Sequence, residues 1–449
     1  MVHGPLAKNV LRFAVPLMLT SVLQLLFNAA DLIVVSNFAG ANAMGSVGAT
    51  GSLINLIINV VMGMSIGTSV LVARHWGARE GEDVSKVVHT SVTFSVVGGI
   101  VIGIIGIFIS RPMLQLMDTP PEIIDGSTTY MRIYFAGFPI IALYNFGAAV
   151  LRSTGDTKHP LYFLMIAGVI NVLLNLLFVI VFHMGVAGVA IPTVISQAIS
   201  AFLVLRCMVK SNTAIHFDIR KAKMDWGKLK EMMKIGLPAG IQGSIFSISN
   251  VVIQSSINYF GAVAVSGSAA SANLEGFVYV IMSAFYQTSL TFTGQNVGAK
   301  NYSRIMKVMV TTVSMVAAFG LVFGVGVYLA GGTLLKIYTQ DPEVIKYAIE
   351  RLLYLSAPYF ICGIMDTMVG MMRGLGYSIT PMIVSLTGVV GIRLGWIFTI
   401  FAANKTLPTL FISYPISWTV TALTHIGCFI YAYRKLMKKV NSEEHNLTV

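Results

Sequence analysis

The sequence matches itself without a gap when it is displaced by 221 residues. The matched segments are Asn37–Ala41 with Asn258–Ala262, Gly77–Arg79 with Gly298–Lys300, Pro121–Ile124 with Pro342–Ile345, and Arg152, Gly155 and Pro160 with Arg373, Gly376 and Pro381. These matches share one register and span more than a hundred residues. The chain therefore contains two copies of one structural unit.

The composition places both copies in a membrane. The chain is 55% hydrophobic and 11% charged, whereas a soluble domain is roughly 25% charged. Its apolar residues form twelve stretches near the roughly 20 residues that cross a bilayer: 11–37, 50–72, 88–110, 130–150, 160–182, 187–209, 236–258, 268–292, 308–331, 350–371, 380–402 and 409–433. We predict an all-α integral membrane protein with twelve transmembrane helices, arranged as two pseudo-symmetric six-helix bundles.

The basic residues predict the topology. If both termini are cytoplasmic, 23 of the 30 lysines and arginines lie on the inside, as the positive-inside rule requires. This orientation gives an N-lobe (1–209), a basic cytoplasmic linker (210–235) and a C-lobe with a short tail (236–449). An even number of spans per copy makes the repeat parallel, as in some secondary transporters. We expect a multi-pass plasma membrane protein, and we interpret the net charge of +12 as a topology signal, not as a nucleic-acid site.

Few charged side chains lie well inside the predicted spans. They are Asp31, Glu275, Asp366 and Arg393. Each costs roughly 2.5–3.5 kcal/mol at the centre of a span on insertion scales, so a functional role is the default hypothesis. The alternative is a structural ion pair within the bundle, for instance between Asp366 and Arg393.

Uncharged polar residues accompany Asp31 in the first copy. Asn171 and Asn175 are four residues apart and share a helix face; the others are Gln24, Asn28, Asn145 and Thr193. A carboxylate with amide and hydroxyl oxygens suits a hard cation such as sodium. The carboxylate could instead bind a proton, because burial disfavours its charged form. The structural alternative is hydrogen bonding between helices.

The sequence gives little support for an enzyme. His183 and His425 stand apart from other histidines, and Cys207, Cys362 and Cys428 lie in three separate spans. This spacing suggests no metal centre, so we expect no catalytic site, no cofactor and no metal other than a coupling sodium ion. We interpret the cysteines as packing residues.

The chain resembles the multidrug and toxic compound extrusion (MATE) transporters along its whole length. The resemblance rests on Val15-Pro16 followed by Asp31, on Arg152-Ser-Thr-Gly155-Asp156 with its partner Arg373-Gly374-Leu-Gly376, and on Gly185-Val-Ala-Gly188-Val-Ala190. It implies two six-helix bundles in a V around a central cavity. It also implies export of amphipathic, often cationic compounds by sodium or proton antiport.

The resemblance also implies roles for individual residues. The family's first-helix aspartate matches Asp31, and its fifth-helix asparagine and sixth-helix threonine match Asn171 and Thr193. At Asn175 the family has an aspartate, so this chain lacks one formal charge, which leaves proton coupling more open. Glu275 resembles an acid of the second lobe, and Asp366 loosely resembles a tenth-helix acid.

An ion-driven exporter working by alternating access is therefore our main reading, in which a cationic amphiphile competes for the carboxylates. Aromatic faces attract organic cations, so the candidate substrate-binding residues are Gln24, Asn28, Tyr134, Tyr144, Asn145, Tyr279, Tyr286 and Gln287. The alternative is a flippase for lipid-linked oligosaccharides or lipid II in the same superfamily, although such a protein usually lines its cavity with more basic residues. We expect a monomer in the bilayer that binds small organic molecules.

Overall fold

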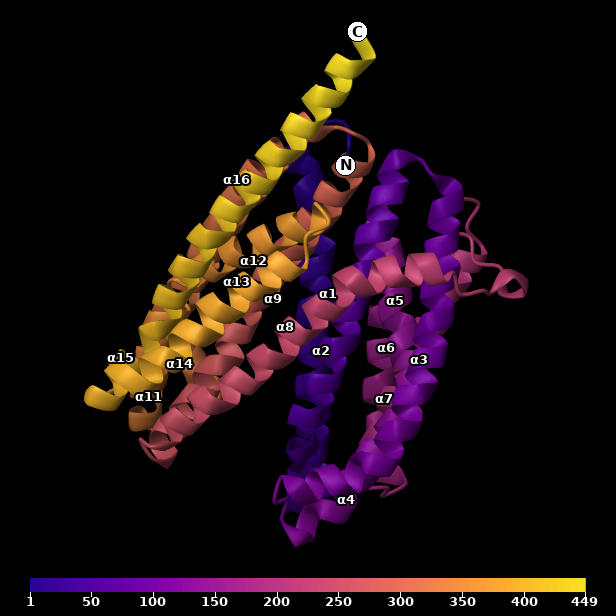
Figure 1. Cartoon of the computed structure of the whole chain (residues 1–449). Coiled ribbons are helices and arrows are strands. Elements are labelled where there is room, and N and C mark those ends of the chain that lie inside the picture. Colours follow the sequence, from indigo (N-terminus) through magenta and orange to yellow (C-terminus); the bar gives the residue numbers. More distant parts are fainter. Residues whose placement is uncertain (449) are drawn as a thin grey trace. The chain divides into compact units, whose positions relative to one another are not determined.

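The computed structural model describes residues 1–448, and the side chains of Ser36, Ala41 and residues 443–448 are not considered further. The described chain is helical, without strands (Figure 1). Its α-helices are α1 (Leu6–Val34), α2 (Ala41–Ala78), α3 (Gly81–Leu116), α4 (Pro121–Ala136), α5 (Phe138–Thr154), α6 (Lys158–Leu176), α7 (Ala187–Val209), α8 (Trp226–Asn258), α9 (Ala262–Gly298), α10 (Tyr302–Leu334), α11 (Pro342–Leu355), α12 (Tyr359–Gly374), α13 (Ile379–Ser385), α14 (Ile392–Trp396), α15 (Leu407–Phe411) and α16 (Ser413–Thr448).

Most of the predicted spans are single apolar helices. Within residues 1–448, eight helical segments are long and apolar enough to cross a membrane. Two bent pairs raise this number to ten: α4 with α5, bent by 50°, and α11 with α12, bent by 45°. The long helices α9 and α16, of 37 and 36 residues, occupy the other two predicted positions. The predicted twelve-helix, all-α membrane fold is confirmed.

The structure explains why the two copies match where they do. Several matched residues have a positive φ: Gly40 (86°) with Gly261 (87°), Arg79 (61°) with Lys300 (55°), and Gly155 (107°) with Gly376 (93°). A positive φ favours glycine, because it brings a Cβ close to the backbone. The matched Pro121 and Pro342 both begin a helix, α4 and α11. The repeat is therefore strongest where the chain turns.

Two compact units make up the chain, and each takes a segment from the opposite sequence half. One unit contains residues 19–240, and the other contains residues 1–18 together with 241–449. Helices α1 and α8 are thus each divided, two residues after Pro16 and Pro238 respectively. The sequence grouping into 1–209, 210–235 and 236–449 remains a prediction about spans, and residues 226–235 belong to α8.

Packing accounts for both exchanged segments. In the unit of residues 1–18 and 241–449, Phe13 joins the apolar core and meets the Phe292 ring edge-on, with centroids 5.7 Å apart. In the unit of residues 19–240, α8 lies directly against α2, where an added Cβ on Gly63 would meet the backbone of Gly240. Small residues allow helices in a membrane to approach this closely.

Candidate functional site

Asp31 lies in a chain of polar side chains that joins three helices of the unit of residues 19–240. The amide Nδ2 of Asn175 on α6 donates to Oδ1 of Asp31 on α1 and also to Oδ1 of Asn171, at 3.1 Å. Asn171 Nδ2 lies 3.4 Å from Oγ of Ser196 on α7. Asn171 and Asn175 are buried, and Asp31 is partly buried. We call Asp31, Asn171, Asn175 and Ser196 the Asp31 cluster.

Close packing of α1 on α6 brings this cluster together. Gly168 shares a face of α6 with Asn171 and Asn175, because it precedes them by three and seven residues. A Cβ on Gly168 would meet the ring of Phe27, which lies one turn before Asp31 on α1. The missing side chain at Gly168 therefore lets α1 come near enough for Asp31 to accept a hydrogen bond from Asn175.

Two of the three helices that carry the cluster, α1 and α6, change geometry shortly after their cluster residues. A π-helical segment, Val35–Ala39, follows Asp31 in α1, and another, Leu177–Val181, follows Asn175 in α6. The π-helix is rare and often marks a functional site. These segments end the regular helices just beyond the polar side chains.

One oxygen atom in the cluster has no protein partner. Oδ1 of Asn175 is buried and makes no hydrogen bond among the described residues. A buried acceptor without a partner is costly. The Asp31 carboxylate and this amide oxygen together form an oxygen-rich group of the kind that a hard cation binds.

Thr193 and Ser196 on α7 change the set of residues predicted to bind the coupling cation. The Thr193 hydroxyl donates to the Val189 carbonyl oxygen of its own helix, at 2.9 Å, so its link to the cluster runs through Ser196, which donates to the carbonyl oxygen of Thr193. Sequence reasoning did not single out Ser196. Its position three residues after Thr193 on the same helix was the available signal.

Glu275, a candidate coupling residue, has a cationic partner in the structure. Arg351 on α11 donates to both of its carboxylate oxygens, Nε to Oε1 at 2.9 Å and Nη2 to Oε2 at 3.1 Å. Ser271 Oγ donates to the same Oε1 at 2.7 Å. Glu275 is only 5% exposed, so this is a buried, bidentate ion pair. A coupling role for Glu275 remains a prediction, but the acid is not available to a cation while Arg351 holds it.

Asp366 and Arg393 form no ion pair within the part of the chain that the structure describes. Arg393 donates from Nε to Ser417 Oγ at 3.0 Å, and its guanidinium carbon lies 4.0 Å from the centroid of the Tyr414 ring. Stacking on an aromatic face stabilises a buried cation. The structural ion pair considered from the sequence is therefore not formed, and a coupling role for Asp366 stays a prediction.

The candidate substrate-binding residues differ in their exposure. Gln24, Asn28 and Tyr279 are exposed, and Asn145, Tyr286 and Gln287 are partly so. Tyr286 accepts a hydrogen bond from Arg373, at 2.6 Å. Tyr134 and Tyr144 are buried in their unit, and a substrate-binding role for all eight candidates stays a prediction.

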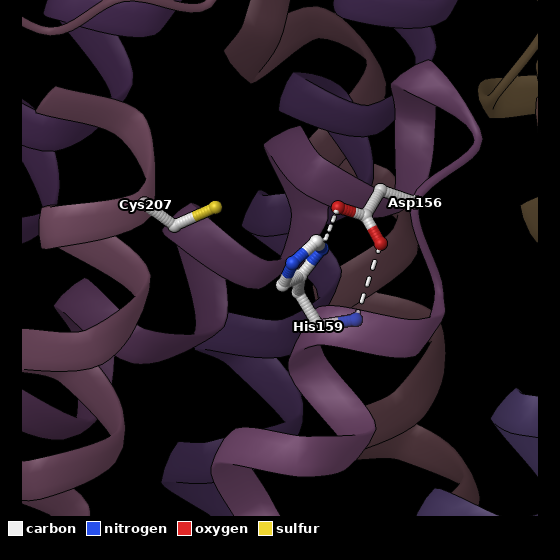
Figure 2. Close-up of side chains that lie close together, drawn as sticks. All are labelled: Asp156, His159 and Cys207. Carbon is white, nitrogen blue, oxygen red and sulfur yellow. Dashed lines mark hydrogen bonds and ion pairs between the residues drawn. The ribbon is translucent and has the colours of Figure 1, made fainter. Parts of the chain in front are cut away.

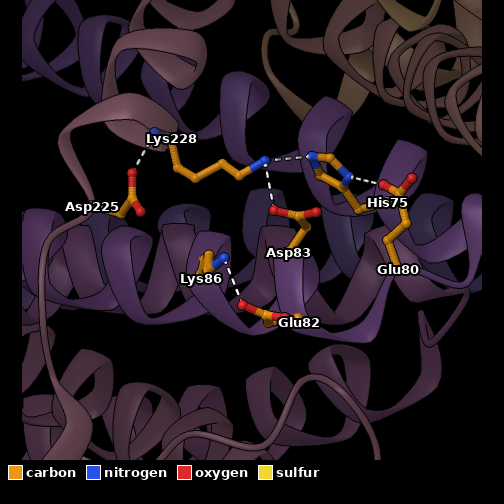
Figure 3. A network of polar contacts seen from close by, with 7 residues as sticks. All are labelled: His75, Glu80, Glu82, Asp83, Lys86, Asp225 and Lys228. Carbon is orange, nitrogen blue, oxygen red and sulfur yellow. Dashed lines mark hydrogen bonds and ion pairs between the residues drawn. The ribbon is translucent and has the colours of Figure 1, made fainter.

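A second polar cluster lies where α8 begins. The ammonium group of Lys228 lies 3.0 Å from Asp83 and donates to Nε2 of His75 at 3.1 Å (Figure 3). Nδ1 of the same imidazole pairs with Glu80 at 2.5 Å. Lys228 thus holds the start of α8 to the turn between α2 and α3. The ammonium group of Lys228 already lies between His75 and Asp83, so these side chains are a poor candidate for a metal site.

The fold is that of an integral membrane protein with an internal duplication. The family model described as MatE matches residues 16–177 and again residues 238–398, once in each sequence half. These matches cover more than half of the chain, so the chain belongs to the MatE family. It is a transporter and not an enzyme.

Relatives in this family cover nearly the same length. The chain is 28% identical over 432 residues to the probable multidrug resistance protein YoeA of Bacillus subtilis, covering 94% of this chain and 93% of the relative. It is 24% identical over 398 residues to the probable multidrug resistance protein NorM of Thermotoga maritima, covering 86% and 84%. A solved structure described as the outward-facing conformation of a multidrug resistance MATE family transporter superposes with a TM-score of 0.91, over 97% and 98% of the two chains at 22% identity. That likeness establishes the fold.

Proposed function

We propose that this protein exports amphipathic organic compounds in exchange for a cation, and that the Asp31 cluster binds the coupling cation. The observation that carries the proposal is the partly buried Asp31 carboxylate next to the Asn175 amide oxygen, which has no hydrogen-bond partner among the described residues. Two relatives named as probable multidrug resistance proteins support export of organic compounds. Placement in the plasma membrane with cytoplasmic termini and a monomeric state belong to the same proposal.

In this mechanism the cation replaces the hydrogen bond that now holds Asp31. In the structure the Asp31 carboxylate accepts a hydrogen bond from the Asn175 amide. When a proton or sodium ion binds, the carboxylate no longer needs that donor, and the amide can turn its Oδ1 toward a bound sodium ion. A ligand shifts a conformational equilibrium only through its different affinities for the two states. Cation binding therefore drives the transporter toward the state in which Asp31 is loaded.

The donor set of the Asp31 cluster favours a proton over sodium as the coupling cation. Asn171 and Asn175 supply neutral oxygens, so Asp31 is the only formal negative charge in the Asp31 cluster. A site with an aspartate at position 175 would offer sodium two carboxylates, and this site offers it one. Proton binding needs only the Asp31 carboxylate. We accordingly expect a proton gradient to drive transport more strongly than a sodium gradient.

Vesicles containing the purified protein test this proposal. Efflux of an ethidium-type organic cation is followed under an imposed proton or sodium gradient, for wild type and Asp31→Asn. We expect gradient-driven efflux by wild type and a loss of at least tenfold in Asp31→Asn. Asp118→Asn is the control, because Asp118 is exposed and asparagine tolerates its positive φ of 52°.

Two results would contradict the proposal. One is efflux by Asp31→Asn at the wild-type rate under both gradients. The other is wild-type efflux that neither gradient changes for any organic cation tried. Translocation of a lipid-linked oligosaccharide by the same vesicles, without organic cation efflux, would favour the flippase alternative.

A further inference from the structure

Three potential metal ligands meet in the unit of residues 19–240, away from the Asp31 cluster. Asp156 follows the turn that ends α5, His159 lies in the first turn of α6, and Cys207 lies in the last turn of α7. Sequence spacing did not predict this group, because Cys207 is 48 residues from His159. Figure 2 shows the His159 imidazole between the Asp156 carboxylate and the Cys207 thiol.

Asp156 fixes the orientation of the histidine. One carboxylate oxygen accepts from the backbone N–H of His159 at 3.1 Å, and the other pairs with Nδ1 of the ring at 2.5 Å. A histidine that ligates a metal typically donates its other ring N–H to a carboxylate in this way. With Nδ1 engaged, Nε2 is the nitrogen left for a metal ion.

The three groups lie close to the spacing that a metal requires. One ligand atom from each residue lies within 4.8 Å of the others. Zinc holds sulfur at about 2.3 Å and nitrogen at about 2.0 Å, which separates two tetrahedral ligands by about 3.5 Å. Because His159 is exposed and Cys207 is partly exposed, side-chain rotation can close the difference and water can complete the shell.

The second copy of the repeat shows that the fold leaves room here. At the 221-residue offset Asp156, His159 and Cys207 correspond to Tyr377, Thr380 and Cys428. These three residues line one cavity of about 300 Å³ in the other unit. Both copies thus bring the same three positions together, and only the first copy equips them with a carboxylate, an imidazole and a thiol.

We propose that Asp156, His159 and Cys207 form a binding site for a divalent transition metal ion such as Zn²⁺. Cys207 loses its thiol proton to solvent and binds as thiolate, His159 binds through Nε2, and Asp156 orients the imidazole. Thiolate and imidazole are the ligands that zinc favours. The bound ion joins the start of α6 to the end of α7. This site does not depend on the proposed transport function.

Metal titration of the full-length protein, purified in detergent with any polyhistidine tag removed, tests the site. Calorimetry with Zn²⁺ measures stoichiometry and affinity, and ultraviolet absorption with Cd²⁺ detects metal–thiolate bonds. We expect one Zn²⁺ per wild-type chain. Cys207→Ser and His159→Gln should weaken binding at least tenfold, and Asp156→Asn by about 10- to 100-fold, the usual effect of removing a residue that orients a ligand.

Cys428→Ser is the matched control, because it removes the corresponding thiol of the second copy, where Tyr377 and Thr380 stand in place of Asp156 and His159. It should keep both the Zn²⁺ affinity and the Cd²⁺–thiolate absorption. The proposal is overturned if the wild type shows no Cd²⁺–thiolate absorption, a result that depends on no variant folding. It is also overturned if Cys207→Ser binds Zn²⁺ as tightly as the wild type does.

Discussion

Three charged side chains in the spans, Asp31, Glu275 and Arg393, have different kinds of partner, and the partner limits what each charge can do. Asp31 accepts from a neutral amide, which a cation can displace without leaving a second charge unpaired. Glu275 is held by a guanidinium at two points. Arg393 stacks on Tyr414 and donates to a hydroxyl. Of these three groups, we propose Asp31 as the one that binds a cation reversibly, because its partner is a neutral amide.

The ion pair of Glu275 predicts a stability effect. Glu275→Gln leaves the buried Arg351 cation without its acid and should lower the free energy of unfolding by about 3–5 kcal/mol. Replacing both residues, as Glu275→Gln with Arg351→Met, should recover most of this loss. Thermal unfolding in detergent measures both changes. Equal stability of Glu275→Gln and wild type would refute a structural role for the pair.

The amide at position 175 predicts ion selectivity. Asn175→Asp places a second carboxylate beside Asp31, and two adjacent carboxylates are best satisfied when a cation lies between them. Sodium should then stimulate efflux more strongly in Asn175→Asp than in wild type. Efflux is measured at fixed pH with increasing sodium. A sodium response no larger than that of wild type would argue against the assignment of Asn175 as a ligand.

The sequence predicted three members of the Asp31 cluster, but it did not predict the ion pair between Glu275 and Arg351. Helical spacing paired Asn171 with Asn175, and the resemblance to the MATE transporters implied that Asp31 joins them; the structure brings the three together. Arg351 lies at the very end of a predicted span, 350–371, and is 76 residues away from Glu275, so the sequence offered no reason to pair the two. Such a contact depends on how α9 packs against α11, and no local pattern encodes it.

At the scale of elements, glycine positions decide how closely helices approach. Gly168 on α6 faces the ring of Phe27 on α1, and the approach it allows sets the distance between Asp31 and Asn175. Helical spacing predicted the helices themselves. The π-helical segments after Asp31 and Asn175 were not predicted, because one wider turn over five residues is too short to change the periodicity of the sequence.

Gly168→Ala should therefore separate α1 from α6. Its Cβ would meet the Phe27 ring, and overpacking of this kind costs typically 1–3 kcal/mol. Gradient-driven efflux should fall along with stability, because the Asp31 cluster loses its alignment. Gly51→Ala is the control, since a Cβ at Gly51 on α2 meets nothing within 4 Å. The account predicts no loss for Gly51→Ala, and equal behaviour of the two variants would count against it.

At the scale of the whole molecule, the duplication was predictable and the composition of the two units was not. A 221-residue repeat identifies two copies, and the family model matches each of them. It does not reveal that residues 1–18 pack with 241–449, or that residues 226–240 pack with the first copy. Those assignments depend on contacts such as Phe13 with Phe292, between residues far apart in the sequence.

The most direct test of the account measures the cation itself. Vesicles containing the protein receive an organic cation on one side, without an imposed ion gradient, and an internal pH dye or radioactive sodium reports cation movement. Thermodynamic coupling is reciprocal, so substrate moving one way should drive protons or sodium the other way in wild type, and at least tenfold less in Asp31→Asn. A counter-flow of wild-type size in Asp31→Asn would contradict the central claim that this carboxylate binds the coupling cation.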